Sequence, residues 1–198
     1  MTQGQLMLLS GGGFSTETNS YIDQVAFNLC QNKGKKRIVF VPTASHDAQG
    51  YIDKFKEAFS EHETYVLKVE DLEQSVGIEE MDIIYIGGGD PHYLVETWKT
   101  TGFDKIITKC LAMGILVIGI SAGAMCWFEK MRSEKKTTDG LGLLEGSMCP
   151  HYDEKCEETL DYDIWAKENP AIKHIKLNNN ENLHVIDGTI MAKISSLS

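Results

Sequence analysis

The sequence predicts an α/β fold with a mainly parallel central sheet that helices cover on both faces. Short apolar runs alternate with segments of helical character from residue 5 to residue 128, which is the pattern of consecutive β-α-β units. The run Ile115–Ile120 is continuously apolar and rich in Ile and Val. Such a run is typical of a strand that is buried on both faces of a parallel sheet.

Each predicted strand is a short apolar run, and each predicted helix carries apolar residues at helical spacing. The first helix, for example, has one apolar stripe formed by Ile22, Val25, Ala26 and Leu29. The predicted strands are Gln5–Leu9, Ile38–Val41, Tyr65–Val69, Met81–Ile86 and Ile115–Ile120. The predicted helices between them are Thr18–Cys30, Tyr51–Phe59, His92–Lys99 and Phe103–Ala112.

The pattern changes after Phe128. Residues 129–139 are mostly charged and are expected to be largely solvated. Glu157–Lys167 is an amphipathic helix that ends before Pro170, because proline cannot continue a helix. Two apolar segments then flank Asp187-Gly188, a strong hairpin signal, which predicts a C-terminal β-hairpin from Leu183–Ile186 and Ile190–Ile194. No repeat or linker interrupts the chain, so we expect a single domain over residues 1–198.

Composition restricts the partners and the compartment. The formal net charge is −10 and the isoelectric point is about 5.0. Nucleic acids and anionic membranes require a basic surface, so neither is expected as a partner. Neither a targeting leader nor a membrane-spanning segment is expected, because the first residues are not basic and apolar and no apolar run approaches about 20 residues. Its five cysteines form no Cys-x-x-Cys pair, which favours a reducing, cytoplasmic location with Cys30, Cys110 and Cys126 as core residues.

The chemistry centres on the turn that follows the central strand. Gly119-Ile120-Ser121-Ala122-Gly123 lies between a predicted strand and a helix-compatible segment, which is the context of a nucleophile elbow. Side chains at Gly119 and Gly123 would collide where the chain folds back. The turn would expose the Ser121 hydroxyl above the sheet edge, and the Ala122 N–H would face any negative charge that develops there.

Two further loops follow predicted strands and are expected at the same edge of the sheet. Gly87-Gly88-Gly89-Asp90 leaves backbone N–H groups uncovered, which suits the approach of a substrate or an oxyanion. The loop after the second strand carries His46. Gly89, Asp90 and His46 are therefore candidate substrate contacts.

A serine hydroxyl needs a base in order to act as a nucleophile at neutral pH. The chain has six histidines. His151 lies in a loop after Pro150, and His46 is a weaker candidate. Helix-edge, surface or strand positions are expected for the other four, which are His62, His92, His174 and His184.

The assembled residues resemble the peptidase E family of serine dipeptidases and its cyanophycinase-like relatives. The resemblance rests on Ile86–Asp90, on Gly119–Ala124 and on Cys149-Pro150-His151-Tyr152, in this order along most of the chain. It implies a three-layer sandwich related to the class I glutamine amidotransferases (flavodoxin-like).

The same resemblance implies that Ser121 is the nucleophile and His151 the general base. It also implies an oxyanion hole built from the N–H groups of Gly88 and Ala122. The third member is an acidic residue between the serine and the histidine that orients the imidazole. Glu134 fits that position best, and Asp139 is second.

The expected reaction is hydrolysis of short peptides through an acyl-enzyme, without a metal or an organic cofactor. Peptidase E has asparagine where this chain has Asp90, and a carboxylate there would disfavour an acidic substrate side chain. The negative net charge suits a substrate with a free α-amino group. The candidate assembly is a homodimer. A zinc site from Cys149, His151, Asp153 and Cys156 is disfavoured, because the spacing matches no common structural site.

Two other interpretations stay open. The chain could hydrolyse a different acyl substrate, as an esterase-like or amidotransferase-like enzyme, although amidotransferases carry cysteine at the elbow. It could also be a catalytically silent binding or regulatory domain that keeps the fold, since a fold alone does not define a function.

Overall fold

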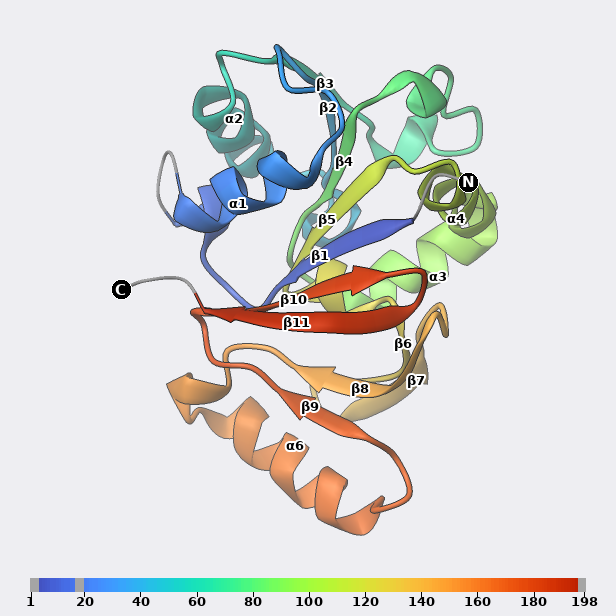
Figure 1. The fold of residues 1–198 in the computed structure, drawn as a ribbon. Helices are drawn as coiled ribbons and strands as arrows, with labels where there is room; N and C mark the ends of the chain where they lie inside the picture. The colour runs from blue at the N-terminus through green and yellow to red at the C-terminus, as the bar shows by residue number, and fades with distance from the viewer. Residues whose placement is uncertain (1–3, 17–19, 196–198) are drawn as a thin grey trace.

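A seven-stranded sheet forms the centre of the protein in a computed structural model that describes residues 4–16 and 20–195. Its strand order is β11-β10-β1-β5-β4-β2-β3 (Figure 1). These strands are β1 (Gln5–Leu9), β2 (Arg37–Val41), β3 (Glu63–Val66), β4 (Ile83–Ile86), β5 (Leu116–Ile120), β10 (Glu181–Ile186) and β11 (Thr189–Ser195). The α-helices are α1 (Tyr21–Leu29), α2 (Gln49–Ala58), α3 (Pro91–Thr101), α4 (Phe103–Ala112), α5 (Ala122–Met125) and α6 (Glu157–Glu168).

The five strands from β1 to β5 are parallel to one another, and the C-terminal hairpin β10–β11 extends the sheet antiparallel to β1. The α/β fold, the mainly parallel sheet and the hairpin are therefore confirmed. The third strand begins at Glu63 and ends at Val66, earlier than predicted, because residues 69–71 form a 3₁₀ turn. The predicted start of the first helix, Thr18, lies outside the described residues.

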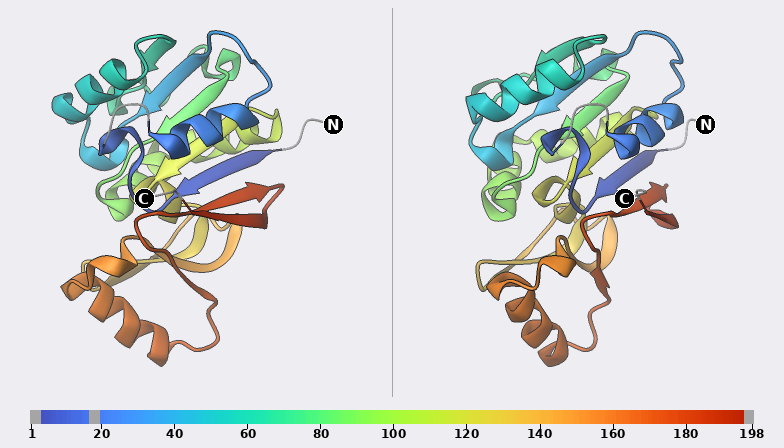
Figure 2. Two further views of the ribbon diagram at one scale, coloured as in Figure 1. Left: turned by 60° about the vertical axis from the view of Figure 1, so that its left-hand side comes forward. Right: turned by 90° about the vertical axis from the view of Figure 1, so that its left-hand side faces the viewer.

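Two apolar cores lie on opposite faces of this sheet, because successive side chains of a strand point to opposite faces. Met7 and Leu9 of β1 pack on one side with residues of α1 and α2, including Ile22 and Phe55. Leu6 and Leu8 pack on the other side with α3 and α4 and with a second, smaller sheet. Figure 2 shows this smaller sheet and α6 as a separate layer below the central sheet.

The second sheet corrects the expectation that residues 129–139 are a solvated charged stretch. They belong to β6 (Phe128–Ser133) and β7 (Lys136–Asp139), which form a hairpin. β8 (Leu144–Cys149) and β9 (His174–Lys176) complete the order β7-β6-β8-β9. Phe128 and Met131 are both fully buried although they are three positions apart, because the pairing of β6 with β8 shifts register between Phe128 and Lys130. One face of the hairpin therefore packs on the core while the other meets solvent.

An ion pair joins α6 to this second sheet. Arg132 on β6 donates from Nε and Nη2 to the two carboxylate oxygens of Asp161 on α6, at 2.7 and 2.8 Å. Both side chains are only 17% exposed, and the bidentate geometry makes the pair stronger than a single surface contact. The guanidinium holds the pKa of the Asp161 carboxyl below its usual range. Among the described residues, no helix is long and apolar enough to cross a membrane.

Asp161→Asn is expected to lower the free energy of unfolding at pH 7 by about 1–2 kcal/mol, because it leaves Arg132 without its carboxylate partner. A depressed pKa in the folded state means that this stabilisation is present above the ordinary Asp pKa, near 4, and is lost as the pH falls through the lower folded value. Urea unfolding at a series of pH values should show the difference from wild type shrinking below about pH 4.

Asp139→Asn is the matched control. Asp139 pairs with Lys130 on the exposed face of the same hairpin, where an ion pair contributes little to stability. Equal destabilisation by both substitutions, or an Asp161→Asn effect that persists unchanged into acid, would contradict the assignment.

Candidate active site

Ser121 occupies a strained turn between β5 and α5. Its φ is 52° and its ψ is −110°, a conformation that costs a non-glycine residue roughly 1–3 kcal/mol. Hydrogen bonds hold the turn on both sides. Ser121 N–H donates to Leu9 O of β1 at 2.9 Å, and Ser121 O accepts from the N–H groups of Ala124 and Met125 at 2.9 Å each. The surrounding structure therefore imposes the backbone conformation that presents the hydroxyl.

The two glycines of the turn allow β5 and α5 to approach this closely. A Cβ atom on Gly119 would lie 2.0 Å from Gly123 O, and one on Gly123 would lie 2.7 Å from Ile86 O of β4. Both contacts are backbone atoms that cannot move aside cheaply. A side chain at either position would therefore collide with the backbone, as the sequence analysis expected.

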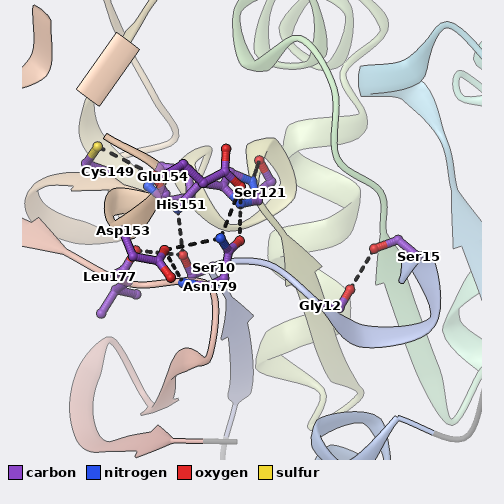
Figure 3. Close-up of polar contacts among 11 residues, drawn as sticks. Ser10, Gly12, Ser15, Ser121, Cys149, His151, Asp153, Glu154, Leu177 and Asn179 are labelled. Carbon is purple, nitrogen blue, oxygen red and sulfur yellow. Dashed lines mark hydrogen bonds and ion pairs between the residues drawn. The ribbon is translucent and has the colours of Figure 1, made fainter. Parts of the chain in front are cut away.

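His151 reaches Ser121 from the loop that follows β8, so the pair joins the two sheets. Its Nε2 lies 3.1 Å from Ser121 Oγ (Figure 3). The backbone N–H of His151, which has a φ of 52°, donates to Ser10 Oγ at 2.9 Å, and the Ser10 hydroxyl donates to Leu177 O at 2.9 Å. Ser10 is fully buried at the end of β1. The histidine is therefore anchored to the central sheet through its own backbone.

The partner of the other ring nitrogen differs from the expectation. His151 Nδ1 lies 2.6 Å from Asn179 Oδ1 and 3.6 Å from Glu154 Oε1. Glu134 instead lies in the β6–β7 turn with a φ of 49°, on a surface shared with Lys135 and Glu157. The expected Glu134–His151 contact is not found among the described residues, because residues 128–139 fold into a hairpin whose turn holds Glu134. The second choice, Asp139, pairs with Lys130.

The predicted oxyanion donors border Ser121 but differ in their present partners. A Cβ atom on Gly88 would lie 3.3 Å from Ser121 Cβ, so this glycine is adjacent to the serine. Its N–H already donates to Tyr51 Oη at 3.3 Å. Burial raises the pKa of Tyr51 to about 12, so this hydroxyl stays protonated. Ala122 is the first residue of α5, where an N–H has no acceptor within the helix.

The three candidate substrate contacts have different surroundings. Asp90 caps α3, with Oδ1 accepting from the N–H groups of His92 and Tyr93 at 2.8 and 3.1 Å. Its carboxylate therefore caps the helix, and its expected effect on acidic substrates stays a prediction. His46 is exposed and stacks on Tyr93 with 3.9 Å between ring centroids. Gly89 alone of these three lines the cavity beside Ser121.

This cavity holds about 130 Å³ and contains both Ser121 and His151. Its wall carries two carboxylates, Glu154 and Glu158, and one guanidinium, that of Arg132, which is paired with Asp161. Glu158 accepts a hydrogen bond from Ser133 Oγ at 2.6 Å. Within residues 4–16 and 20–195, no three His, Cys, Asp or Glu side chains gather in a way that could hold a metal ion.

The residues that sequence reasoning missed come from distant loops. Asn179 lies between β9 and β10, Glu154 follows His151 by three positions, and Ser10 and Gly11 follow β1. The run Asn178-Asn179-Asn180, placed just before a hairpin strand, was the available signal for a polar loop with a specific role.

Comparison with known proteins agrees with this architecture. YgaJ of Bacillus subtilis, an uncharacterised peptidase, is 34% identical over 98% of this chain and 88% of its own length. Peptidase E of Streptomyces coelicolor is 27% identical over 59% of this chain and 51% of its own length.

Two solved structures share the fold. A Listeria monocytogenes protein assigned to peptidase E superposes with a TM-score of 0.71 at 22% identity, over 100% of both chains. A peptidase from an acI-B1 actinobacterium reaches 0.73 at 23% identity, over 92% of this chain and 83% of its own. These likenesses confirm the predicted class I glutamine amidotransferase-like fold.

The model of peptidase family S51 matches residues 6–193, which include the elbow, the glycine loop and the His151 loop. The predicted resemblance is therefore confirmed, and the chain belongs to peptidase family S51.

Proposed function

We propose that this peptidase-family protein is a serine-type peptidase that hydrolyses short peptides, dipeptides among them, through an acyl-enzyme. The observation that carries the proposal is the 3.1 Å approach of His151 Nε2 to Ser121 Oγ at a strained turn inside a cavity. A hydroxyl presented to a base at this distance is the arrangement that nucleophilic catalysis requires.

In the proposed reaction, His151 Nε2 takes the proton of Ser121 Oγ as the oxygen attacks the peptide carbonyl carbon. The resulting oxyanion accepts hydrogen bonds from Ala122 N–H and Gly88 N–H. The Gly88 donor must first leave Tyr51 Oη, and a charged oxygen outcompetes a neutral hydroxyl because charge-assisted hydrogen bonds are roughly twice as strong. His151 then protonates the leaving amine, and water hydrolyses the ester by the same path.

The surroundings of the dyad support a small substrate with a free amino terminus. The cavity beside the dyad is small, about 130 Å³, which favours a short substrate. The carboxylates of Glu154 and Glu158 favour an α-ammonium group. The charge of Arg132 is compensated by its bidentate pairing with Asp161, so this guanidinium contributes little to the binding of an acidic side chain. The substrate we propose is a short peptide whose first side chain is neutral or basic.

The cysteines support a reducing compartment, and we propose the cytoplasm. All five thiols are free. Burial raises the pKa of Cys149, beside the cavity, to about 12, so this thiol stays protonated and does not compete with Ser121 as a nucleophile.

Ser121→Ala is expected to reduce dipeptide turnover by at least about 10³-fold, because the proposed acyl-enzyme forms on the Ser121 hydroxyl. The measurement is amine release from a dipeptide panel, together with labelling of the protein by a fluorophosphonate. Ser60→Ala, on the exposed turn after α2, should leave both signals unchanged. A wild-type chain that neither hydrolyses the panel nor reacts with the fluorophosphonate would favour the silent binding domain or a different acyl substrate.

The same panel tests specificity. Wild type should cleave Ala-x dipeptides faster than Asp-x dipeptides, and Glu158→Gln should reduce this preference roughly fivefold, since a partly exposed like-charge contact is worth about 1 kcal/mol. The glutamine keeps an acceptor for Ser133 Oγ, so the wall is preserved. Glu70→Gln, on an exposed 3₁₀ turn, is the charge-matched control. Preferential cleavage of Asp-x by wild type would contradict this assignment of substrate charge.

A further inference from the structure

We propose that His92 is a positioning residue for the substrate, and that its ring fixes the β6–β7 hairpin as one wall of the catalytic cavity. The hairpin contributes Arg132 and Ser133 to the lining of the cavity beside Ser121. The inference rests on the proposed function, since it assigns a part in holding the peptide that this site would hydrolyse. Among the described residues, those that line the cavity do not include His92, so its effect on the substrate passes through the hairpin.

The main chain of His92 is tied to the glycine loop. His92 is the second residue of α3, and its N–H donates to Asp90 Oδ1 at 2.8 Å as part of the helix cap. Gly89 and Pro91, on either side of the capping residue, line the catalytic cavity. The backbone at the start of α3 is therefore held beside the cavity by a contact that does not involve the imidazole.

The half-buried ring of His92 reaches both strands of the hairpin, which lies beside α3 in Figure 1. Nε2 lies 3.1 Å from Ser133 O at the end of β6, and Nδ1 lies 2.6 Å from Thr138 Oγ1 on β7. A carbonyl oxygen only accepts hydrogen bonds, so Nε2 carries the proton of the neutral ring and Nδ1 accepts from the Thr138 hydroxyl. Each ring nitrogen therefore has one partner, and each partner lies on a different strand.

Ser133 connects this attachment to α6. Its carbonyl accepts from the His92 ring, and its Oγ donates to Glu158 Oε1 at 2.6 Å. Ser133 is buried, and the neighbouring Arg132 pairs with Asp161 of the same helix. The end of β6 is thus held between α3 and α6. Loss of the His92 ring would release the α3 side, and the wall that carries Glu158 would no longer be fixed relative to the glycine loop.

The nucleophile and the base are held by contacts outside the hairpin. Ser121 N–H donates to Leu9 O of β1. His151 N–H donates to Ser10 Oγ, just after the same strand. A change at His92 therefore leaves both reacting groups in place and loosens a wall that contacts the bound peptide. Loss of an interaction that is equally present in the ground state and the transition state raises KM and leaves kcat unchanged.

The test measures KM and kcat for an Ala-x dipeptide. His92→Phe keeps a ring and loses both hydrogen bonds, so KM should rise about tenfold while kcat changes by less than about twofold. His92→Gln offers an N–H donor and an oxygen acceptor, and KM should return to within about threefold of wild type. The rate at which a fluorophosphonate labels Ser121 should match wild type in both variants.

Thr138→Val tests the same contact from the hairpin side, at a residue that is not one of the described residues lining the cavity. It removes one of the two bonds and should raise KM about threefold. In combination with His92→Phe it should add little, because both substitutions break the same contact. The matched control is Thr100→Val, since Thr100 donates to Glu96 O within α3, and this variant should keep the wild-type KM and kcat.

An unchanged KM in His92→Phe would overturn the proposal, and so would a fall in kcat accompanied by slower fluorophosphonate labelling. If His92→Phe does not fold, Thr138→Val decides, with a raised KM as the expected result and an unchanged KM as the opposing one. If wild type hydrolyses no peptide, the proposed function fails separately. Hydrogen exchange of the amides of residues 128–139 then tests the attachment: faster exchange in His92→Phe than in Thr100→Val supports it, and equal exchange overturns it.

Discussion

The contact between the backbones of β5 and α5 is the constraint on which the rest of the site depends. Gly119 lies so near the carbonyl of Gly123 that a single Cβ atom would prevent the approach. The tight turn forces Ser121 to a positive φ, at a local cost of roughly 1–3 kcal/mol. Burial of β5 between β1 and β4 offsets that cost, so a fully buried strand carries the strained residue at its end.

Everything else at the site is positioned relative to that turn by tertiary contacts. The Ser10 hydroxyl, just after β1, accepts a hydrogen bond from His151 N–H and donates one to Leu177 O. This buried group therefore links the loops that follow β8 and β9 of the second sheet to the central sheet. Gly88, at the end of β4, borders the serine. The carboxyl ends of parallel strands meet at one edge, which explains why residues so far apart in the chain share one small cavity.

The parts of the fold and site that sequence reasoning predicted are those with a local physical signature. The buried strands are continuous apolar runs, the elbow needs its two glycines, and Asp187-Gly188 predicts the hairpin. The β6–β7 hairpin was missed because its residues are mostly charged and the register shift between Phe128 and Lys130 interrupts the alternation of buried and exposed positions. The sequence analysis named Glu134, with Asp139 second, and did not consider Asn179, whose side chain contacts His151, since a single amide far along the chain has no signature until β9 and β10 bring it back to His151.

The adjacency of β1 and β10 has a consequence for a chain made from its N-terminus on the ribosome. Every residue of β1 pairs with a residue of β10, although most of the sequence separates the two strands. Contacts between residues so far apart in the chain form late. A nascent chain can complete the serine turn with β1, β4 and β5 while Asn179 is still unmade. Under the proposed function, the segment that carries the nucleophile is therefore made before the loops that carry and hold His151, and hydrolysis requires those later loops.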